Sequence, residues 1–263
     1  MSDIIPLFST SASLKSGGIF TVNKAGDRER PDSPKKGPIS VCNIAKDDGF
    51  KQVYLVETNF VNFMLGYKNL KDAKADLVFG LKLVVCEDMN DKNDTSFKTE
   101  SKVIIFLKNS DGYQALIKIY SKAAQDGFYY VPRIDWKTLK AMWSENLILS
   151  LPFYSSFLAK NTLTFASIVP DLPAKPVLLK EVGQEHPHDV ILDDVILRYA
   201  SSMEVTVQKV KSIYYMKRDD AKKWMIWSCI LNRATWDKPN LDNCCSREFC
   251  YQSFLELKNR SFE

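Results

Sequence analysis

The sequence predicts an α/β protein whose strands close into a distorted barrel of seven or eight strand–helix units. From residue 50 onward, short aliphatic runs alternate with stretches in which apolar residues recur about every 3.6 positions. This alternation continues through seven or more units, which is typical of a mainly parallel sheet that closes on itself, as in the (β/α)₈ type. The composition, 45% hydrophobic and 26% charged, is that of a folded globular protein.

The individual elements follow from residue type and spacing. Strands are expected in the aliphatic and β-branched runs 53–57, 79–86, 103–107, 147–151, 163–168, 177–180 and 211–216. Helices are expected where apolar residues return with helical period, at 60–74, 112–125, 136–143, 153–160, 189–203 and 224–236. Because strands and helices alternate, most strand pairs should be parallel.

The chain is expected to form a single domain over residues 1–263, with two interruptions. Residues 23–38 are rich in proline, glycine and charge, which predicts a long surface loop. Residues 87–101 are polar, which predicts an exposed hairpin tip or a flexible insert.

Charge and hydropathy set limits on location and partners. The net charge of +4 permits contact with phosphate but falls short of a dedicated nucleic-acid binder. The longest apolar runs, such as 103–107, are too short to span a bilayer, and no secretory signal begins the chain. We therefore expect a cytoplasmic protein.

The cysteines do not suggest a metal site. None stands in a C-x-x-C pair, so we expect reduced, mostly buried thiols and no structural zinc. The six cysteines are Cys42, Cys86, Cys229, Cys244, Cys245 and Cys250.

Three segments carry a family resemblance. Residues 79–85 read FGLKLVV, residues 102–139 run from KVIIFLKNSDGYQAL to VPRIDWKTL, and residues 146–158 read NLILSLPFYSSFL. They resemble the PHP (polymerase and histidinol phosphatase) domain at the start of bacterial DNA polymerase III alpha subunits. PLFSTSASLKSGG (6–18) is similar to the opening strand of that family, and VETNFVNFMLG (56–66) to its second motif. Stand-alone copies are often encoded by large bacteriophages, which points to a phage source.

The resemblance implies a distorted TIM-like barrel with a metal site at the C-terminal ends of its strands. Histidines and carboxylates there hold divalent metals that activate water for phosphoester hydrolysis. Carried over position by position, the ligand positions hold Phe8, Thr10, Asn59, Phe60, Lys82, Lys102, Tyr214 and Trp224. The chain has only two histidines, His186 and His188, both in one loop. We therefore expect no metal and no other cofactor.

Each of these residues has a functional and a structural interpretation. Lys82 and Lys102 could contact a phosphate of DNA or a nucleotide, or could form a salt bridge that closes an obsolete cavity. Arg133 could contact nucleic acid or another partner, or could form a local ion pair. The aromatic residues at ligand positions could fill that cavity or stack on bases. The pair His186 and His188 makes only a partial metal set, so exposed loop histidines are favoured.

The resemblance leads to two hypotheses about function. The first is a non-catalytic replication accessory or scaffold that contacts DNA or a polymerase or exonuclease partner. The alternative is a divergent metal-dependent phosphoesterase or 3′–5′ exonuclease. That enzyme would have to recruit unconventional ligands from Glu57, Glu87, Asp88, Asp193, Asp194 and the two histidines.

Overall fold

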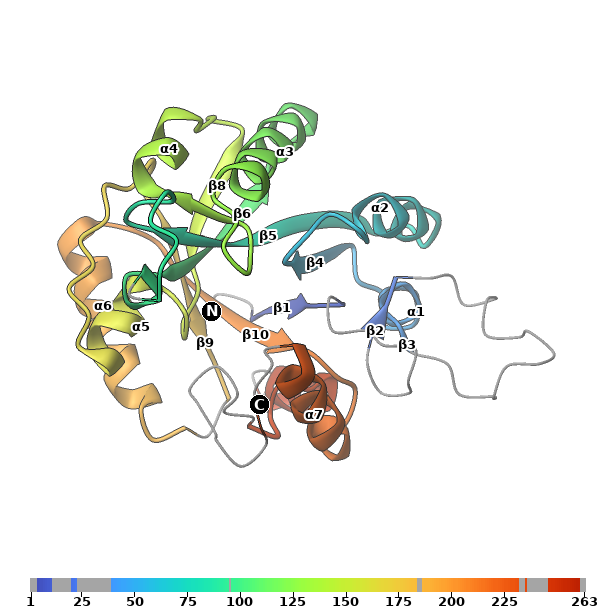
Figure 1. Ribbon diagram of the computed structural model, residues 1–263. Helices are drawn as coiled ribbons and strands as arrows, with labels where there is room; N and C mark the ends of the chain where they lie inside the picture. The colour runs from blue at the N-terminus through green and yellow to red at the C-terminus, as the bar shows by residue number, and fades with distance from the viewer. Residues whose placement is uncertain are drawn as a thin grey trace. The chain divides into compact units, whose positions relative to one another are not determined.

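The computed structural model (Figure 1) describes residues 4–10, 20–22, 39–94, 96–183, 186–231, 235 and 246–260. Its strands are β1 (Ile5–Phe8), β2 (Phe20–Thr21), β3 (Ile39–Ser40), β4 (Gln52–Glu57), β5 (Asp76–Cys86), β6 (Ser101–Leu107), β7 (Arg133–Asp135), β8 (Leu147–Leu151), β9 (Val177–Glu181) and β10 (Val207–Ile213). Its helices are α1 (Val41–Asp47), α2 (Phe63–Asp72), α3 (Ser110–Gln125), α4 (Trp136–Ala141), α5 (Phe157–Thr164), α6 (Asp189–Met203), α7 (Ala221–Leu231) and α8 (Tyr251–Arg260). Two short 3₁₀ turns, η2 (Ser96–Lys98) and η3 (Arg218–Asp220), complete the described elements.

The main sheet has the hydrogen-bonding order of a closed barrel. Its strands follow one another as β4-β1-β10-β9-β8-β6-β5-β7, and a further pairing of β4 with β5 closes seven of them into a ring. Strand β1 is parallel to β4 and β10, and β8 is parallel to β9, whereas β6 is antiparallel to both of its neighbours. The predicted α/β barrel fold is confirmed, with β6 as the departure from parallel pairing.

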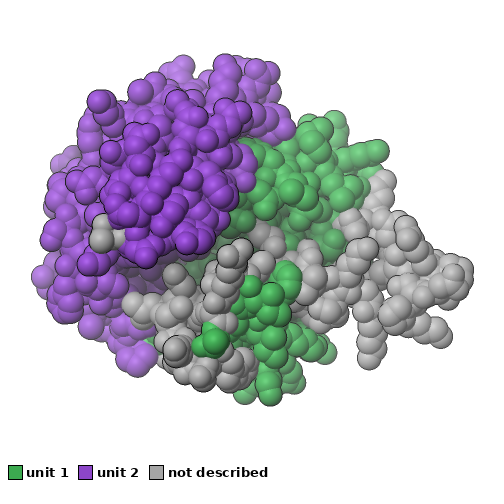
Figure 2. Space-filling model, in the orientation of Figure 1, with its two compact units in different colours: residues 1–79, 181–186, 209–263 green, residues 80–180, 187–208 purple. Residues whose placement is uncertain are grey.

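The chain forms two compact units, coloured separately in Figure 2. Unit 1 comprises residues 1–79, 181–186 and 209–263, and unit 2 comprises residues 80–180 and 187–208. Strand β5 contributes residues to both units.

Unit 1 is built around aromatic packing at the end of β1. The ring of Phe8, which is fully buried, lies edge-on to Phe20 with centroids 5.7 Å apart and packs against Phe50 and Tyr251. The Tyr251 hydroxyl donates to the Asp48 carboxylate (2.5 Å), which ties α8 to the end of α1. Such buried rings contribute both apolar area and edge-to-face contacts.

A charged network also holds α8 in unit 1. The guanidinium of Arg218 donates to both carboxylate oxygens of Glu248 (2.7 and 2.8 Å) and to both of Glu256 (2.8 Å each). This pairing lowers the pKa of the Glu248 carboxyl. Because the fork of arginine matches a carboxylate with two parallel bonds, the contact also fixes orientation.

In unit 2, helix α3 begins at a polar cap and buries one face. The side chain of Asn109 accepts a hydrogen bond from the backbone N–H of Gly112 (3.0 Å). Leu116 and Ile119 face inward, and the helix packs on β6 and β7. A Cβ at Gly112 would lie 2.3 Å from the carbonyl oxygen of Asn146, so this close approach requires glycine.

The polar connection between β5 and β6, residues 87–100, is fastened to unit 2 by one buried arginine. The guanidinium of Arg133 donates to the Ser96 hydroxyl (2.9 Å), the Glu100 carboxylate (2.8 Å) and the carbonyls of Asp91 (3.0 Å) and Gly127 (3.2 Å). The Arg133 side chain is fully buried. The connection therefore has an ordered anchor in addition to its exposed polar residues.

One predicted strand is wrong. Residues 163–168 were expected to be extended, but α5 continues to Thr164 and no strand follows it directly. The hydroxyls of Thr162 and Thr164 donate to carbonyls four residues earlier, which lets these β-branched residues remain helical. Beyond the helix, Asn161 brackets the backbone of Ile168 with two hydrogen bonds (2.8 and 2.9 Å).

Some of the predicted features lie outside the residues that the structure describes. The loop predicted over 23–38 lies outside them, as do Cys244 and Cys245, and α7 is described only to Leu231 of the predicted 224–236. The four described cysteines, Cys42, Cys86, Cys229 and Cys250, are free and buried, as predicted. Across the described residues, no helix has both the length and the apolar character needed to cross a bilayer.

We predict that Arg133→Met lowers the free energy of unfolding by about 2–4 kcal/mol, because it leaves the half-buried Glu100 carboxylate, the Ser96 hydroxyl and two carbonyls without their donor. Urea unfolding followed by circular dichroism measures the change. Arg198→Met is the matched control in unit 2: Arg198 pairs with Asp194 at the surface, so its loss should change stability by less than about 0.5 kcal/mol. Equal losses in the two variants would contradict the anchoring role of Arg133.

Candidate functional site

In unit 1, the expected ligand position at the end of β1 is occupied by the phenyl ring of Phe8. Phe8 has no exposed surface, and its ring is enclosed by Phe20, Phe50 and Tyr251. A phenyl ring has no lone pair for a divalent ion, and here it contributes packing to the core.

The second position, Thr10, is bonded to the chain itself. The backbone N–H of Thr10 donates to Oε1 of Glu57 (2.7 Å), and its hydroxyl donates to the same oxygen. The side-chain amide of Asn62 donates to the Thr10 hydroxyl (2.8 Å). Thr10 and Glu57 are 1% and 2% exposed, so their hydrogen bonds compensate for the burial of a carboxylate. Glu57, at the end of β4, is the buried acid beside this expected ligand position.

The remaining expected positions of unit 1 form local contacts. Asn59 accepts a hydrogen bond from the backbone N–H of Val61 (3.0 Å), and Phe60 stacks on Phe79 with centroids 5.5 Å apart. Tyr214 and Trp224 stack nearly parallel, with centroids 4.7 Å apart and planes 14° apart. Aromatic pairing thus occupies places where the resemblance implies polar ligands.

Two buried charged residues of unit 1 escaped the sequence interpretation. Glu181 ends β9, and its two carboxylate oxygens accept from the backbone N–H (2.6 Å) and the hydroxyl (2.7 Å) of Ser212. Lys211 lies on β10, fully buried, and donates to the carbonyls of Val182 (3.0 Å) and Gly183 (2.9 Å). The sequence gives little signal for either residue, because Glu181 follows Lys180 at the end of VLLKE and VQKVKSI is polar at four of its seven positions.

Burial governs the protonation of Lys211. Desolvation lowers the pKa of its ammonium group, and the nearby carboxylates of Glu181 and Glu248 oppose that shift. The ammonium also lies 5.6 Å from the centre of the Phe249 ring.

In unit 2, Lys82 and Lys102 lie on one face of the β5–β6 hairpin. Lys82 is opposite Ile104 and Lys102 is opposite Val84, so the two lysines are diagonal neighbours, roughly 7–8 Å apart at this register. Both side chains are partly exposed. The structure brings these two predicted residues together.

Arg133 and the histidines have other surroundings. The guanidinium of Arg133 is buried with its donors directed at protein groups, which gives no support to a phosphate contact there. His186 lies 6.3 Å from the ring of Phe249, and His188 precedes α6, 5.9 Å from the ring of Tyr154. Both histidines are partly buried instead of exposed.

The acids that an unconventional metal site would need are dispersed. Asp193 pairs with Lys180 (2.9 Å), and Asp194 pairs with Arg198 (2.8 Å) on α6. Glu57 lies in unit 1, whereas Glu87 and Asp88 are exposed in unit 2. Within the described parts of the chain, no three His, Cys, Asp or Glu side chains are grouped so as to hold a metal ion.

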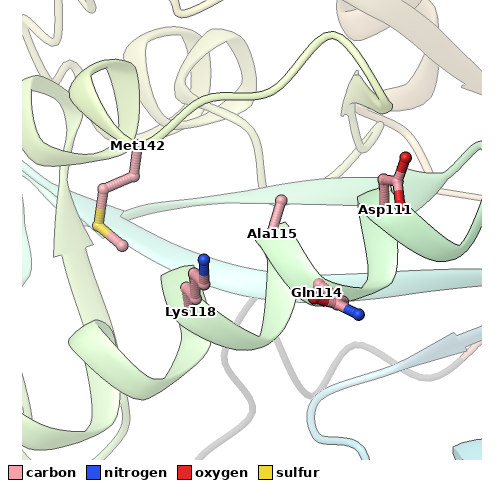
Figure 3. A pocket seen from close by; sticks show the side chains of 5 residues that line it. All are labelled: Asp111, Gln114, Ala115, Lys118 and Met142. Atoms are coloured by element: carbon pink, nitrogen blue, oxygen red, sulfur yellow. The ribbon is translucent and has the colours of Figure 1, made fainter.

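A shallow pocket in unit 2 lies away from all of these residues. It is lined by Asp111, Gln114, Ala115 and Lys118 of α3, with Met142 across from them (Figure 3). None of the expected ligand positions contributes to it. One lysine and one carboxylate at a solvent-facing surface do not define a ligand.

Comparison with known proteins identifies the domain. Residues 37–164 match the PHP domain family. This stretch is a PHP domain. The match spans the second motif and the central segments that carry the resemblance, which is thereby confirmed.

Curated relatives of this chain are named DNA polymerase III subunit alpha. The protein of Borreliella burgdorferi is 26% identical over 203 residues, which is 73% of this chain and 17% of the relative. That of Helicobacter pylori is 32% identical over 98 residues, 36% of this chain and 8% of the relative. That of Aquifex aeolicus is 21% identical over 241 residues, 83% of this chain and 20% of the relative. The chain therefore spans at most a fifth of the length of these relatives.

The residues at the expected ligand positions do not fit the metal cluster that the family implies. Phe8 and Phe60 offer no ligand atom, and the indole of Trp224 can only donate. Thr10 and Glu57 already satisfy one another in a buried pair. Divalent metals in such sites require several nitrogen and oxygen ligands that converge on one point, and the described residues do not provide this set.

We predict that Lys211 makes stability depend on pH in the alkaline range. Because the folded pKa lies below the unfolded value of 10.5, unfolding takes up a proton between these two values. Stability should therefore rise as pH increases through that interval and fall as pH decreases through the folded pKa. Urea unfolding across the range should show this gain in the wild type relative to Lys211→Met, in which the other titrating groups are unchanged. Parallel profiles for the two proteins would contradict the buried-ammonium assignment.

Proposed function

We propose that this chain is a non-catalytic PHP domain that serves DNA replication as an accessory or scaffold. The observation that carries the proposal is the state of the expected ligand positions in unit 1. Phe8, Phe60 and Trp224 are packed against other rings, and Thr10 is bonded to Glu57. Converting the buried positions 8 and 10 to metal ligands would mean opening a closed core.

Two energetic costs, lost core packing and a broken buried hydrogen bond, favour loss of catalysis over relocation of the metal site. A buried ring such as Phe8 stabilises a core by about 3–5 kcal/mol relative to a small side chain. A metal would have to displace such packing and also break the pair between Thr10 and Glu57. The alternative, a divergent metal-dependent phosphoesterase or 3′–5′ exonuclease, lacks a preformed cluster among the described residues.

The relatives suggest the kind of partner. They are named as subunits of a DNA polymerase, and this chain corresponds to no more than a fifth of their length. A PHP domain that has lost its chemistry can still serve as a surface on which a polymerase, an exonuclease or DNA is held. As part of this proposal, we place the protein in the cytoplasm, where bacterial replication occurs, and assign it a phage source.

We predict that the purified protein binds well below one equivalent of manganese, iron or zinc after incubation with each metal and gel filtration. It should also fail to hydrolyse bis-p-nitrophenyl phosphate or to shorten single-stranded DNA with added Mn²⁺. Elemental analysis and both assays check this. Stoichiometric metal together with turnover would overturn the proposal.

Glu57→Gln is the matched control for this experiment, because it keeps the size and the acceptor oxygen of the buried acid of unit 1. Turnover that disappears in Glu57→Gln would belong to this protein and would favour the enzyme alternative. Activity that persists unchanged in Glu57→Gln would point to a contaminant.

A second candidate function, contact with DNA, is favoured by the placement of Lys82 and Lys102. They lie together on one face of β5–β6, as two phosphate contacts along a strand would require. We predict that Lys82→Ala with Lys102→Ala reduces the slope of log affinity for single-stranded DNA against log salt by roughly 1–2. Lys118→Ala with Lys137→Ala, at exposed lysines of the same unit, should leave the slope unchanged. Binding that persists in the first pair would place the contact elsewhere.

A further inference from the structure

Unit 2 presents a group of aromatic rings to solvent between η2 and β7. The rings of Phe97, Tyr129 and Tyr130 contact one another, with centroids 5.4 Å apart for Phe97 and Tyr129 and 4.7 Å apart for the two tyrosines. Tyr130 is 64% exposed, and its neighbours Phe128 and Val131 are 51% and 41% exposed. We call Phe97, Tyr129 and Tyr130 the aromatic platform.

A tight turn and the Arg133 side chain hold the platform in place. Tyr130 has a left-handed backbone (φ 61°) at the tip of a tight turn that Tyr129 closes by donating to the carbonyl of Val131 (3.2 Å). The guanidinium of Arg133 lies 5.0 Å from the centre of the Tyr129 ring. A bulky residue keeps this unfavourable backbone only where its surroundings impose it, and Arg133 and the turn supply that constraint.

The surroundings of the platform are acidic. The Tyr129 hydroxyl donates to Asp94 (3.1 Å), which lies in the exposed part of the 87–100 connection. That connection contains five acidic residues and two lysines, and its Glu100 is already paired with Arg133. The Lys160 ammonium donates to the carbonyl of Phe97 (3.3 Å), so the excess of negative charge around the platform is small. A ligand that approaches Tyr130 therefore meets aromatic faces with the exposed Asp94 carboxylate beside them, a combination that favours a cation over a phosphate.

We infer that the aromatic platform docks a basic segment of a partner protein, with an arginine side chain stacked on Tyr130 and its charge directed toward Asp94. The chain already uses this chemistry internally, where Arg133 stacks on Tyr129. A guanidinium suits the site better than an ammonium because it is planar and can stack while its edge hydrogen-bonds to a carboxylate. The inference deepens the proposed function by naming a partner surface, and it rests on that function only in treating the chain as a binding module.

Single-stranded nucleic acid is the competing occupant. Bases stack on exposed aromatic rings, but each nucleotide brings a phosphate to the same acidic connection. The charge of this surface is opposite to the net charge of the chain, +4, so the platform is locally distinct. Attraction of a basic peptide to the protein as a whole is correspondingly weak.

The test measures fluorescence anisotropy of a short labelled peptide of alternating glycine and arginine, at low salt. Lysine and glutamate versions of the peptide and a thymidine oligonucleotide serve as comparison probes. We expect the arginine peptide to bind best, the lysine peptide more weakly and the glutamate peptide not at all. Tyr130→Asn should weaken the arginine peptide about tenfold, and Asp94→Asn by a factor of roughly 3–10.

Two controls keep the result decisive. Asparagine tolerates a left-handed backbone, so Tyr130→Asn should fold as stably as the wild type, which urea unfolding verifies. Phe165→Ala removes another ring of unit 2, 91% exposed, and should leave peptide binding unchanged. The inference is overturned if Tyr130→Asn binds like the wild type or if Phe165→Ala loses as much. Preferred binding of the oligonucleotide, lost in Tyr130→Asn, would overturn it in favour of nucleic acid.

This test and the test of the proposed function can fail separately. Metal content and turnover are tested with a variant of unit 1, Glu57→Gln. Peptide binding is tested with variants of unit 2, Tyr130→Asn and Asp94→Asn. A metal-loaded, active protein would refute the non-catalytic proposal and leave the peptide result intact. An inactive protein without peptide binding would refute the docking inference alone.

Discussion

Strand β5 has to satisfy three neighbours along its length, and the sheet depends on it. It pairs with β4, β6 and β7, which both closes the ring of seven strands and adds the outer strand β7. Glycine is required at position 80, where β5 pairs with Phe106 of β6, because a Cβ there would lie 2.6 Å from the Phe106 ring. In unit 2, this strand carries Lys82 beside Lys102 of β6, and it pairs with β7, whose Arg133 anchors the 87–100 connection.

The two units differ in how their polar side chains are placed. In unit 1, the expected ligand positions include the buried ring of Phe8 and the buried hydrogen-bonded pair of Thr10 and Glu57. In unit 2, Lys82 and Lys102 are partly exposed on one strand face, and the exposed Asp94 accepts a hydrogen bond from Tyr129. The polar groups of the expected site in unit 1 are therefore bonded within the chain, whereas these groups of unit 2 are accessible to solvent.

Sequence periodicity predicted the elements that have one buried face. The limits of β8 (Leu147–Leu151) and α6 (Asp189–Met203) match the predicted ranges because turn residues flank an uninterrupted pattern. The run 163–168 failed because threonine hydroxyls can bond back to the helix, a contact that β-propensity does not register. For the site, the expected ligand positions came from the family resemblance, whereas the pairing of Glu181 with Ser212 and the burial of Lys211 depend on strand register, which is not readable from one sequence.

Burial lowers the reactivity of three cysteine thiols. Desolvation raises the pKa of Cys86 to about 12 and also raises the pKa values of Cys42 and Cys250, so at neutral pH these thiols carry almost no thiolate. Alkylating reagents and peroxides attack the thiolate, and they reach these sulfurs only when the surrounding elements separate. Cys42, Cys86 and Cys250 therefore react slowly in the native state, and the rate at which each is modified measures how often its region opens.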